Sequence, residues 1–300
     1  MHRSSELRNP GSSVVAPVSL VAPLGVAVSV LAVCVALVLL VWWNQERLVF
    51  QPPRDRPPQV IAEGVRRVSY TADDGQPLHG YLAGRLRPGW PVVIAFHGNA
   101  DLAEWLVPWA VELNARTGAA VLLPEYRGYG VLAGRSTYRT GSIDARAALA
   151  YVRATLPPAS APLVLFGHSL GSAIAAEAAV EEPPSALILQ SPFTSARAMA
   201  ARMLSPAVSP LWNLVSRVHY DTRVRVACLD VPVHVAHGRR DRIIPVAMGR
   251  AVHAAAKHRG QLLLVSDAGH NDVPERGRLS YWRWLEIAVA SAVPFGNISD

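Results

Sequence analysis

The sequence has almost no lysine and very little cysteine. Among its 29 basic residues only Lys257 is a lysine, and the others are arginines, a bias typical of a GC-rich bacterial genome. The formal net charge is +7, but no segment interleaves clustered arginines with aromatic residues, so the sequence does not indicate a nucleic-acid-binding surface. The two cysteines are Cys34 and Cys228, and the first lies in a hydrophobic segment, which excludes a disulfide framework.

The sequence also lacks the motifs that hold metals and phosphate-bearing cofactors. We find no metal-ligand spacing and no glycine-rich loop that could cradle a phosphate. His234 and His237 are three residues apart on an expected strand, so their side chains would point to opposite faces. We therefore expect no cofactor and no metal.

One long apolar run lies near the amino terminus. The run from Leu24 to Trp43 carries no charge, and a helix of about 20 residues spans the roughly 30 Å hydrocarbon core of a bilayer. Trp42 and Trp43 would lie at the membrane interface. A cleavable signal peptide would have a shorter apolar core and a small-residue cleavage site, and Val33 is too bulky for the position before a lipid-modified Cys34. The run therefore predicts an uncleaved anchor.

The anchor predicts a single-pass protein of a bacterial inner membrane. Arg3 and Arg8 precede it, whereas Arg47, Arg54 and Arg56 follow it closely. The positive-inside rule favours a cytoplasmic position for the segment that follows, but the excess is small. The side of the membrane on which the folded domain lies stays open.

The chain divides into five parts by composition. We expect a disordered lead at 1–23, the transmembrane anchor at 24–43, a proline-rich linker at 44–64, one α/β domain at 65–293 and a tail at 294–300.

The domain begins with an expected β-hairpin, with strands at 65–70 and 78–82 around a turn at Asp73-Asp74-Gly75. Short apolar strands then alternate with amphipathic helices, which predicts a mostly parallel sheet covered by helices on both faces. The expected strands are 91–96, 119–124, 162–166, 186–190, 231–236 and 261–265, and the expected helices are 102–115, 143–156 and 280–292.

The segment 194–225 interrupts the alternation of strands and helices. It contains prolines and Trp212 among several arginines. One interpretation is a covering helix followed by a loop. The other is a small helical insertion that caps a site and supplies an apolar acyl pocket.

The strongest chemical motif is Gly167-His168-Ser169-Leu170-Gly171. An apolar strand precedes it and an alanine-rich helical stretch follows it. A serine on a sharp strand-to-helix turn, with glycines that allow the backbone to bend, is typical of a nucleophile elbow. The helix amino terminus behind the turn favours negative charge that develops nearby. The motif therefore predicts Ser169 as a nucleophile.

Partners for the serine follow from the position of the sheet edge. In open α/β sheets, sites lie beyond the carboxyl ends of the strands, and both Asp241 and His270 come just after an expected strand. His270 would accept the serine proton, and Asp241 would orient the imidazole. Asp267 and Asp272 are rival carboxylates because they lie near His270 in sequence. A third rival, Asp230, precedes its strand and would lie at the opposite edge of the sheet.

An oxyanion hole needs two backbone N–H groups that point at one oxygen atom. Leu170, directly after the serine, would supply one of them. The other would come from Asn99 or Ala100, which follow an expected strand, whereas we expect a structural role for His97. The stretch 126–130 follows the next strand, and it either shapes the same rim or forms a glycine turn with packed tyrosines.

These motifs together resemble the membrane-anchored α/β-hydrolase-domain proteins, which include protein depalmitoylases and are similar to the serine-aminopeptidase-like hydrolases. The resemblance covers about 45–292 and includes Arg47-Leu48-Val49-Phe50-Gln51-Pro52. The other motifs that carry it are His97-Gly98-Asn99-Ala100, Tyr126-Arg127-Gly128-Tyr129-Gly130, Gly167-His168-Ser169-Leu170-Gly171-Ser172, Ser191-Pro192-Phe193, His237-Gly238-Arg239-Arg240-Asp241 and Gly269-His270-Asn271.

The resemblance implies an α/β-hydrolase fold and hydrolysis of an ester, thioester or amide. We expect a membrane-anchored serine hydrolase that acts on a small or lipid-like acyl substrate. An aminopeptidase is an alternative, and Glu125 is then the candidate carboxylate for the substrate amine. A catalytically silent scaffold of the same fold is a further alternative.

Overall fold

The computed structural model describes residues 21–53, 62–156, 161–204, 206 and 209–293. Most of the predicted lead, the middle of the predicted linker and the predicted tail 294–300 lie outside these residues.

The first of two compact units, Met1–Val41, contains most of helix α1 (Val21–Val49). By length and composition, Val28–Val49 is apolar enough to cross a membrane, and almost none of it is buried against protein. The sequence predicted the apolar run at 24–43, whereas the helix continues to Val49. The first residues of the predicted linker are therefore helical.

The second unit is Trp42–Asp300, so the last turns of α1 belong to it. Gln45 is fully buried, and its side-chain oxygen accepts a hydrogen bond from the Arg217 backbone at 2.6 Å. Phe50 is also buried and meets Tyr220 edge-on. These contacts place the residues after Trp42 within the packed domain, where the sequence predicted a linker.

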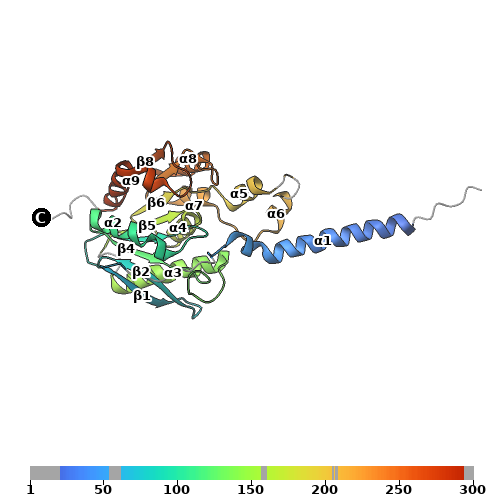
Figure 1. The fold of residues 1–300 in the computed structure, drawn as a ribbon, viewed down its shortest axis with the longest axis horizontal. Coiled ribbons are helices and arrows are strands. Elements are labelled where there is room, and N and C mark those ends of the chain that lie inside the picture. Colours follow the sequence, from blue (N-terminus) through green and yellow to red (C-terminus); the bar gives the residue numbers. More distant parts are fainter. Residues whose placement is uncertain (1–20, 54–61, 157–160, 205, 207–208, 294–300) are drawn as a thin grey trace, which may run out of the picture. The chain divides into compact units, whose positions relative to one another are not determined.

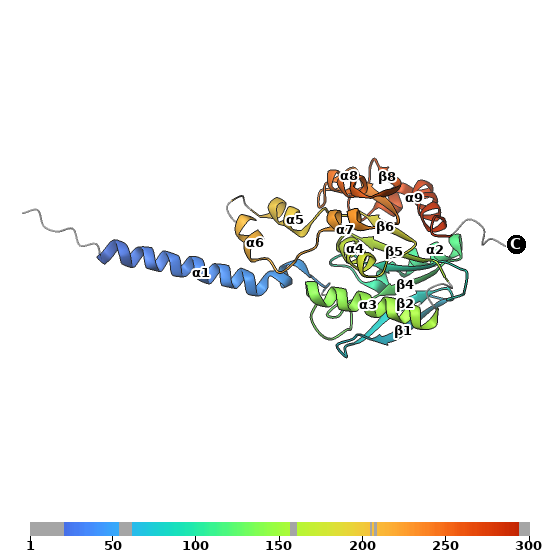
Figure 2. The same cartoon turned by 180° about the vertical axis from the view of Figure 1, so that it is seen from behind.

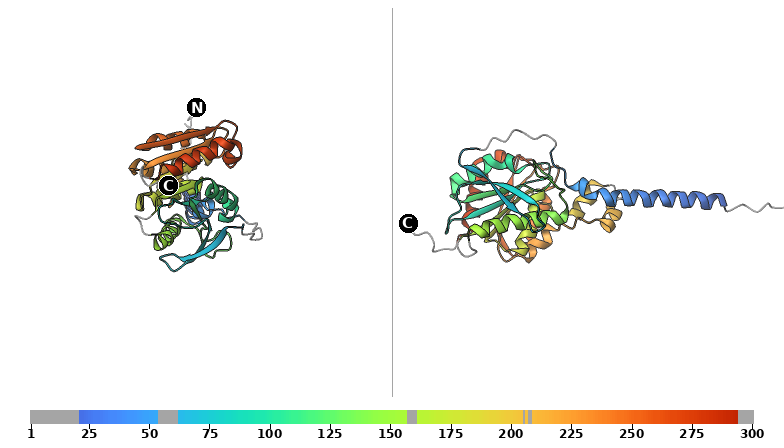
Figure 3. Two further views of the ribbon diagram at one scale, coloured as in Figure 1. Left: turned by 90° about the vertical axis from the view of Figure 1, so that its left-hand side faces the viewer. Right: turned by 90° about the horizontal axis from the view of Figure 1, so that it is seen from below.

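The second unit is built on one eight-stranded sheet in the order β1-β2-β4-β3-β5-β6-β7-β8. The hairpin β1–β2 pairs antiparallel, β2 also runs antiparallel to β4, and all later pairs are parallel. Figure 3 shows the hairpin, in cyan, at one edge of the sheet and β8 near the other. The strands are β1 (Val65–Thr71), β2 (Pro77–Ala83), β3 (Val92–Phe96), β4 (Ala120–Pro124), β5 (Leu163–His168), β6 (Ala186–Gln190), β7 (Pro232–Gly238) and β8 (His258–Val265).

Helices cover both faces of the sheet, as the sequence predicted. The helices α2 (Val107–Thr117) and α9 (Val273–Ala290) lie side by side on one face (Figure 1). On the other face, α3 (Tyr138–Thr155), α4 (Leu170–Glu181) and α8 (Val246–Ala255) pack over a separate apolar core (Figure 2). Strands such as β3 are buried along their whole length because both of their faces are covered.

The described residues of 194–225 include three short helices, where one interpretation of the sequence was a single helix followed by a loop. They are α5 (Ala196–Met203), α6 (Ser209–Val215) and α7 (Thr222–Cys228), the last of which extends just beyond the segment. Val226 in α7 is fully buried in the core of the main domain. The last of these helices is therefore part of the sheet covering.

Candidate active site

Ser169 stands on a strained turn between β5 and α4. Its φ is 53° and its ψ is −114°, a left-handed conformation that costs about 1–3 kcal/mol for a residue with a side chain. The flanking glycines allow the turn, because a Cβ at Gly167 would collide with the backbone of Gly171, and one at Gly171 with the carbonyl of Phe96. The packed turn holds the serine side chain at the carboxyl edge of the sheet despite this strain.

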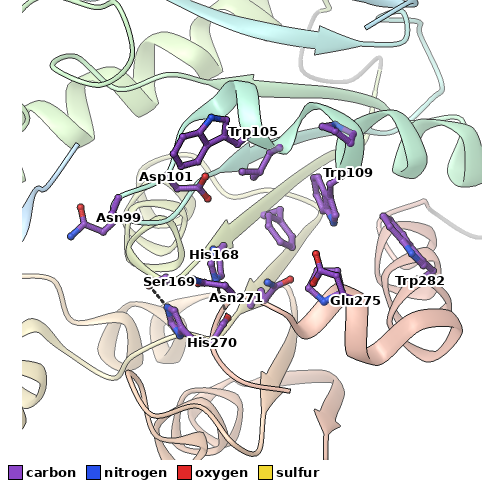
Figure 4. Close-up of a pocket in the computed structure, with 16 residues that line it drawn as sticks. Asn99, Asp101, Trp105, Trp109, His168, Ser169, His270, Asn271, Glu275 and Trp282 are labelled. Carbon is purple, nitrogen blue, oxygen red and sulfur yellow. Dashed lines mark hydrogen bonds between the residues drawn. The ribbon is translucent and has the colours of Figure 1, made fainter. Parts of the chain in front are cut away.

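The structure brings Ser169, His270 and Asp241 into one chain of hydrogen bonds. The Ser169 Oγ lies 2.9 Å from Nε2 of His270, as Figure 4 shows with a dashed line. The other ring nitrogen, Nδ1, lies 2.7 Å from Oδ2 of Asp241. With Nδ1–H donated to the carboxylate, Nε2 is the nitrogen that can accept the serine proton.

Asp241 is buried, and both of its carboxylate oxygens have hydrogen-bond partners. Its Oδ1 accepts from the backbone N–H groups of Ile243 and Ile244 at 2.9 and 2.8 Å. Its Oδ2 contacts His270 and also Nε2 of His237, 3.2 Å away. Burial alone would raise the pKa of Asp241, but hydrogen bonds from the two histidines and from the backbone hold that pKa well below its usual value. The carboxylate therefore stays ionised and fixed beside His270.

The three rival carboxylates have other partners. Asp267 is half exposed and lies near Arg276. Asp272 accepts a hydrogen bond from the backbone N–H of Gly269 at the start of α9. Asp230 pairs with His258 on the surface. Within the described part of the chain, none of them forms a hydrogen bond with the His270 ring.

The candidate oxyanion donors come from two segments, the start of α4 and the turn after β3. Leu170 is the first residue of α4, and Asn99 and Ala100 form a turn after β3. In the described structure their N–H groups donate to no protein acceptor. Ala100 has a φ of 53°, so this turn is strained as well.

The side chain of Asn99 ties this turn to the end of α1. Its Nδ2 donates to the carbonyl oxygen of Val49 at 2.6 Å. Its Oδ1 accepts from the backbone N–H of Gln51 at 2.9 Å and from the Tyr129 hydroxyl at 2.7 Å. The residues after the predicted anchor therefore support the turn that carries the candidate oxyanion donors.

His97 and Glu125 form a buried pair behind the turn. The His97 Nε2 lies 2.8 Å from a Glu125 oxygen, and both side chains are almost fully inaccessible. Burial disfavours charge on His97, yet the neighbouring carboxylate raises its pKa. The Tyr126 hydroxyl donates to the His97 carbonyl at 2.9 Å. This geometry agrees with the structural role expected for His97. Glu125 was the candidate carboxylate for a substrate amine, but its side chain is buried against His97 and does not line the cavity, which corrects that expectation.

A cavity of about 540 Å³ opens beside Ser169 and His270. Its aromatic lining comes from Trp105, Trp109, Phe166 and Trp282, and Figure 4 shows the labelled tryptophans around it. Asp101 and Glu275 add carboxylates, and no arginine or lysine belongs to the described lining. None of the described residues of 194–225 lines this cavity.

His168, which precedes the serine, forms part of the cavity wall. Its ring centroid lies 5.2 Å from that of His270, and its Nε2 lies 3.3 Å from the His270 carbonyl oxygen. Burial lowers the pKa of His168 to about 3, so this ring is neutral at pH 7. A neutral neighbour adds no positive charge beside the imidazole of His270.

Similar proteins show the family to which the chain belongs. Residues 90–228 match the family described as serine aminopeptidase, S33. The uncharacterized protein Rv2307c of Mycobacterium tuberculosis is 33% identical over 255 residues, which cover 83% of this chain and 88% of that protein. The chain belongs to an α/β-hydrolase family. The uncharacterized protein YfhR of Escherichia coli is 30% identical over 215 residues. The aligned region covers 68% of this hydrolase and 73% of YfhR.

Solved structures share the fold of the hydrolase. The esterase Pf2001 of Pyrococcus furiosus superposes with a TM-score of 0.61 at 20% identity, over 80% of this chain and 98% of its own. The acetyl xylan esterase of Paenibacillus sp. R4 gives the same TM-score and identity, over 83% of this chain and 93% of its own.

Sequence reasoning missed several residues of the site in this hydrolase. The contact of His237 with Asp241 was missed because His237 was weighed only as a metal ligand paired with His234. Asp101, Glu275 and the tryptophans carried no motif of their own. Gln190, at the end of β6, also lines the cavity, and a single glutamine at a strand end gives no signal in one sequence.

Proposed function

We propose that the protein is a membrane-anchored serine hydrolase that cleaves acyl esters or thioesters through an acyl-enzyme intermediate. The observation that carries the proposal is the position of His270, 2.9 Å from the Ser169 hydroxyl and 2.7 Å from the Asp241 carboxylate. A serine hydroxyl needs such a base because it is a weak nucleophile by itself.

The proposed reaction runs in two halves. Ser169 Oγ attacks the acyl carbon while its proton moves to Nε2 of His270, and the N–H groups of Leu170 and of Asn99 or Ala100 stabilise the oxyanion. The leaving alcohol or thiol departs with the proton from His270. Water then attacks the acyl-enzyme while its proton moves to His270. The bond between the acyl carbon and Ser169 Oγ breaks as His270 returns that proton to Oγ, and the acid product leaves. Asp241 remains ionised throughout.

The cavity and the apolar helix suggest the substrate. Aromatic side chains line the cavity, which suits an apolar acyl or alkyl group. The helix Val28–Val49 is long enough to hold the domain at a bilayer, where lipid-like esters are found.

A second candidate function is hydrolysis of an amide next to a free amino group. The observation in its favour is that Asp101 and Glu275 line the cavity, where they could bind an ammonium group. Rates with p-nitrophenyl esters of several chain lengths, compared with rates for aminoacyl amides, would separate the two functions.

The serine assignment is tested with a fluorophosphonate probe. We expect the wild-type protein to be labelled and Ser169→Ala to lose both labelling and ester hydrolysis. Ser69→Ala is the matched control, because Ser69 lies exposed on β1 away from the cavity, and it should label normally. Persistent labelling of Ser169→Ala would overturn the assignment, and no labelling of a folded wild-type protein would favour the silent scaffold.

A further inference from the structure

Gln190 is a buried polar residue in the wall of the cavity. It ends β6 directly beside the elbow, because its carbonyl oxygen accepts the N–H of Ser169 at 3.0 Å. It is paired in register with His168, so the two side chains project from the same face of the sheet. Both line the cavity. Only 4% of Gln190 is exposed, so its amide must be matched by specific partners.

A chain of three hydrogen-bonding groups fixes the orientation of this amide. The indole Nε1 of Trp109 lies 2.9 Å from the hydroxyl of Tyr281, and an indole nitrogen can only donate. The Tyr281 hydroxyl therefore accepts from Trp109, and its one hydrogen is directed to Oε1 of Gln190, 2.8 Å away. The acceptor end of the Gln190 amide is thus occupied.

The reversed amide is disfavoured by burial. If Gln190 presented its NH₂ group to Tyr281, the hydroxyl hydrogen of Tyr281 would need another acceptor. Tyr281 is fully buried, and the described structure gives its hydroxyl no partner besides Trp109 and Gln190. An unpaired buried hydroxyl costs about 1–3 kcal/mol, so the first orientation is favoured.

The amide nitrogen of Gln190 is left without a protein partner among the described residues. We propose that Gln190 is a specificity-determining residue whose NH₂ group donates a hydrogen bond to an oxygen atom of the bound substrate. The fixed chain from Trp109 through Tyr281 pre-organises this donor, so binding costs little side-chain entropy. The proposal rests on the proposed hydrolase function, because it concerns the substrate of the same cavity.

The surroundings define the chemical class of the oxygen. Asp101 and Glu275 line the same cavity and would repel an anionic group, and no arginine or lysine among the described lining offsets them. The acceptor is therefore a neutral ether, carbonyl or hydroxyl oxygen, next to apolar parts that pack on Trp109 and Phe166. The hydrolase should prefer an oxygenated ester to a hydrocarbon ester of the same shape.

The test uses pairs of esters in which an oxygen replaces one methylene group. For the acyl side, p-nitrophenyl pentanoate is compared with the 3-methoxypropanoate and ethoxyacetate esters. For the leaving-group side, butyl acetate is compared with 2-methoxyethyl acetate, with acid release followed by titration. The readout is the ratio of kcat/KM for the oxygenated ester to kcat/KM for the hydrocarbon ester, and the series that responds identifies which half of the ester lies near Gln190.

The ratio is then measured in variants, which removes intrinsic differences in ester reactivity. Gln190→Met keeps the side-chain size but has no donor, and Gln261→Met is the matched control because Gln261 lies exposed on β8. We expect Gln190→Met to lower the ratio by roughly five- to tenfold in one series and Gln261→Met to leave it unchanged. Tyr281→Phe, which releases the amide orientation, should lower the same ratio and serves if Gln190→Met does not fold.

Each outcome is decisive. An equal ratio in the wild type and in folded Gln190→Met, or in Tyr281→Phe if Gln190→Met does not fold, overturns the role of Gln190, even if both proteins hydrolyse the esters in a Ser169-dependent manner. No Ser169-dependent hydrolysis of any ester would instead show that the proposed function fails. A loss of rate for all esters by the same factor would show a purely structural role and would also overturn the inference.

Discussion

Replacement of Asn99 by alanine tests whether the end of α1 supports catalysis. Asn99→Ala removes three hydrogen bonds, to Val49, Gln51 and Tyr129, and leaves the backbone sequence of the turn intact. It does not remove the N–H groups proposed to bind the oxyanion. Any loss of rate must therefore come from a change in where those groups lie.

The size of the effect follows from the strain in the turn. Three hydrogen bonds contribute about 1 kcal/mol each, so the variant loses about 3 kcal/mol of support. The left-handed backbone at Ala100, with its φ of 53°, costs about 1–3 kcal/mol, which the turn would release by relaxing. If the relaxed turn is favoured by about 1.4–2.7 kcal/mol, the fraction of molecules whose turn keeps the catalytic conformation falls about 10- to 100-fold. We expect kcat to fall by that factor.

The assay measures kcat and KM with one p-nitrophenyl ester at a temperature where circular dichroism shows the variant to be folded. KM should change little, because Asn99 fixes the turn and most of the aromatic lining is untouched. Tyr129→Phe removes one of the three hydrogen bonds and keeps the ring, so its kcat should fall by about fivefold or less.

The reasoning would be refuted if folded Asn99→Ala kept kcat within about threefold of the wild type, since even one displaced oxyanion donor costs about 100-fold or more. Equal losses in Tyr129→Phe and Asn99→Ala would also contradict it, because the hydroxyl would then carry the whole effect.

Two further variants test the triad and the response of the fold to acid. Asp241→Asn should lower kcat by about 10⁴-fold at neutral pH, because an amide that donates to Nδ1 of His270 places the proton on Nε2, and a loss below about 100-fold would contradict the assignment. Burial, together with the nearby His253, lowers the pKa of His234 to about 4. Its Nδ1 accepts the N–H of Gln261, as an unprotonated ring nitrogen does. The unfolded chain binds this proton first, so the free energy of unfolding should fall by up to about 3 kcal/mol between pH 6.5 and pH 4. In His234→Asn, denaturant unfolding should show a flatter pH dependence over this range, and an unchanged slope would count against the neutral buried histidine.

The sheet and its helices were largely predictable because burial leaves a strong pattern. Strands such as β3 and β6 are uninterrupted apolar runs, since a parallel sheet is covered on both faces, and β6 was predicted to the residue. The helix α8 was not predicted, and the short helices α5 to α7 were predicted only as one covering helix or as a small helical insertion, because they lack a long amphipathic repeat. The extension of α1 to Val49 was missed because its charged last turn, Glu46-Arg47, looked like the end of an anchor.

The predicted site residues illustrate what a single sequence can and cannot supply. Ser169, Asp241 and His270 were chosen because each follows a strand, and the structure places His270 within hydrogen-bonding distance of both Ser169 and Asp241. Glu125 was chosen because it directly precedes the stretch 126–130, which was expected at the rim of the site. Its side chain instead points into the domain and pairs with His97. Sequence position gives the edge of the sheet on which a residue lies, but not the direction of its side chain.

The sequence by itself determined the fold class, the elbow at Ser169 and the apolar helix, because hydrophobic periodicity and glycine punctuation are local properties. The tertiary structure alone decided which groups face the cavity and which are satisfied elsewhere. Asn99 binds residues about 50 positions away, and Gln190 is oriented by Tyr281, 91 positions away. Hydrogen bonds between distant segments leave no spacing pattern in the chain, so the support of the oxyanion turn and the free donor in the cavity become visible only once the chain is folded.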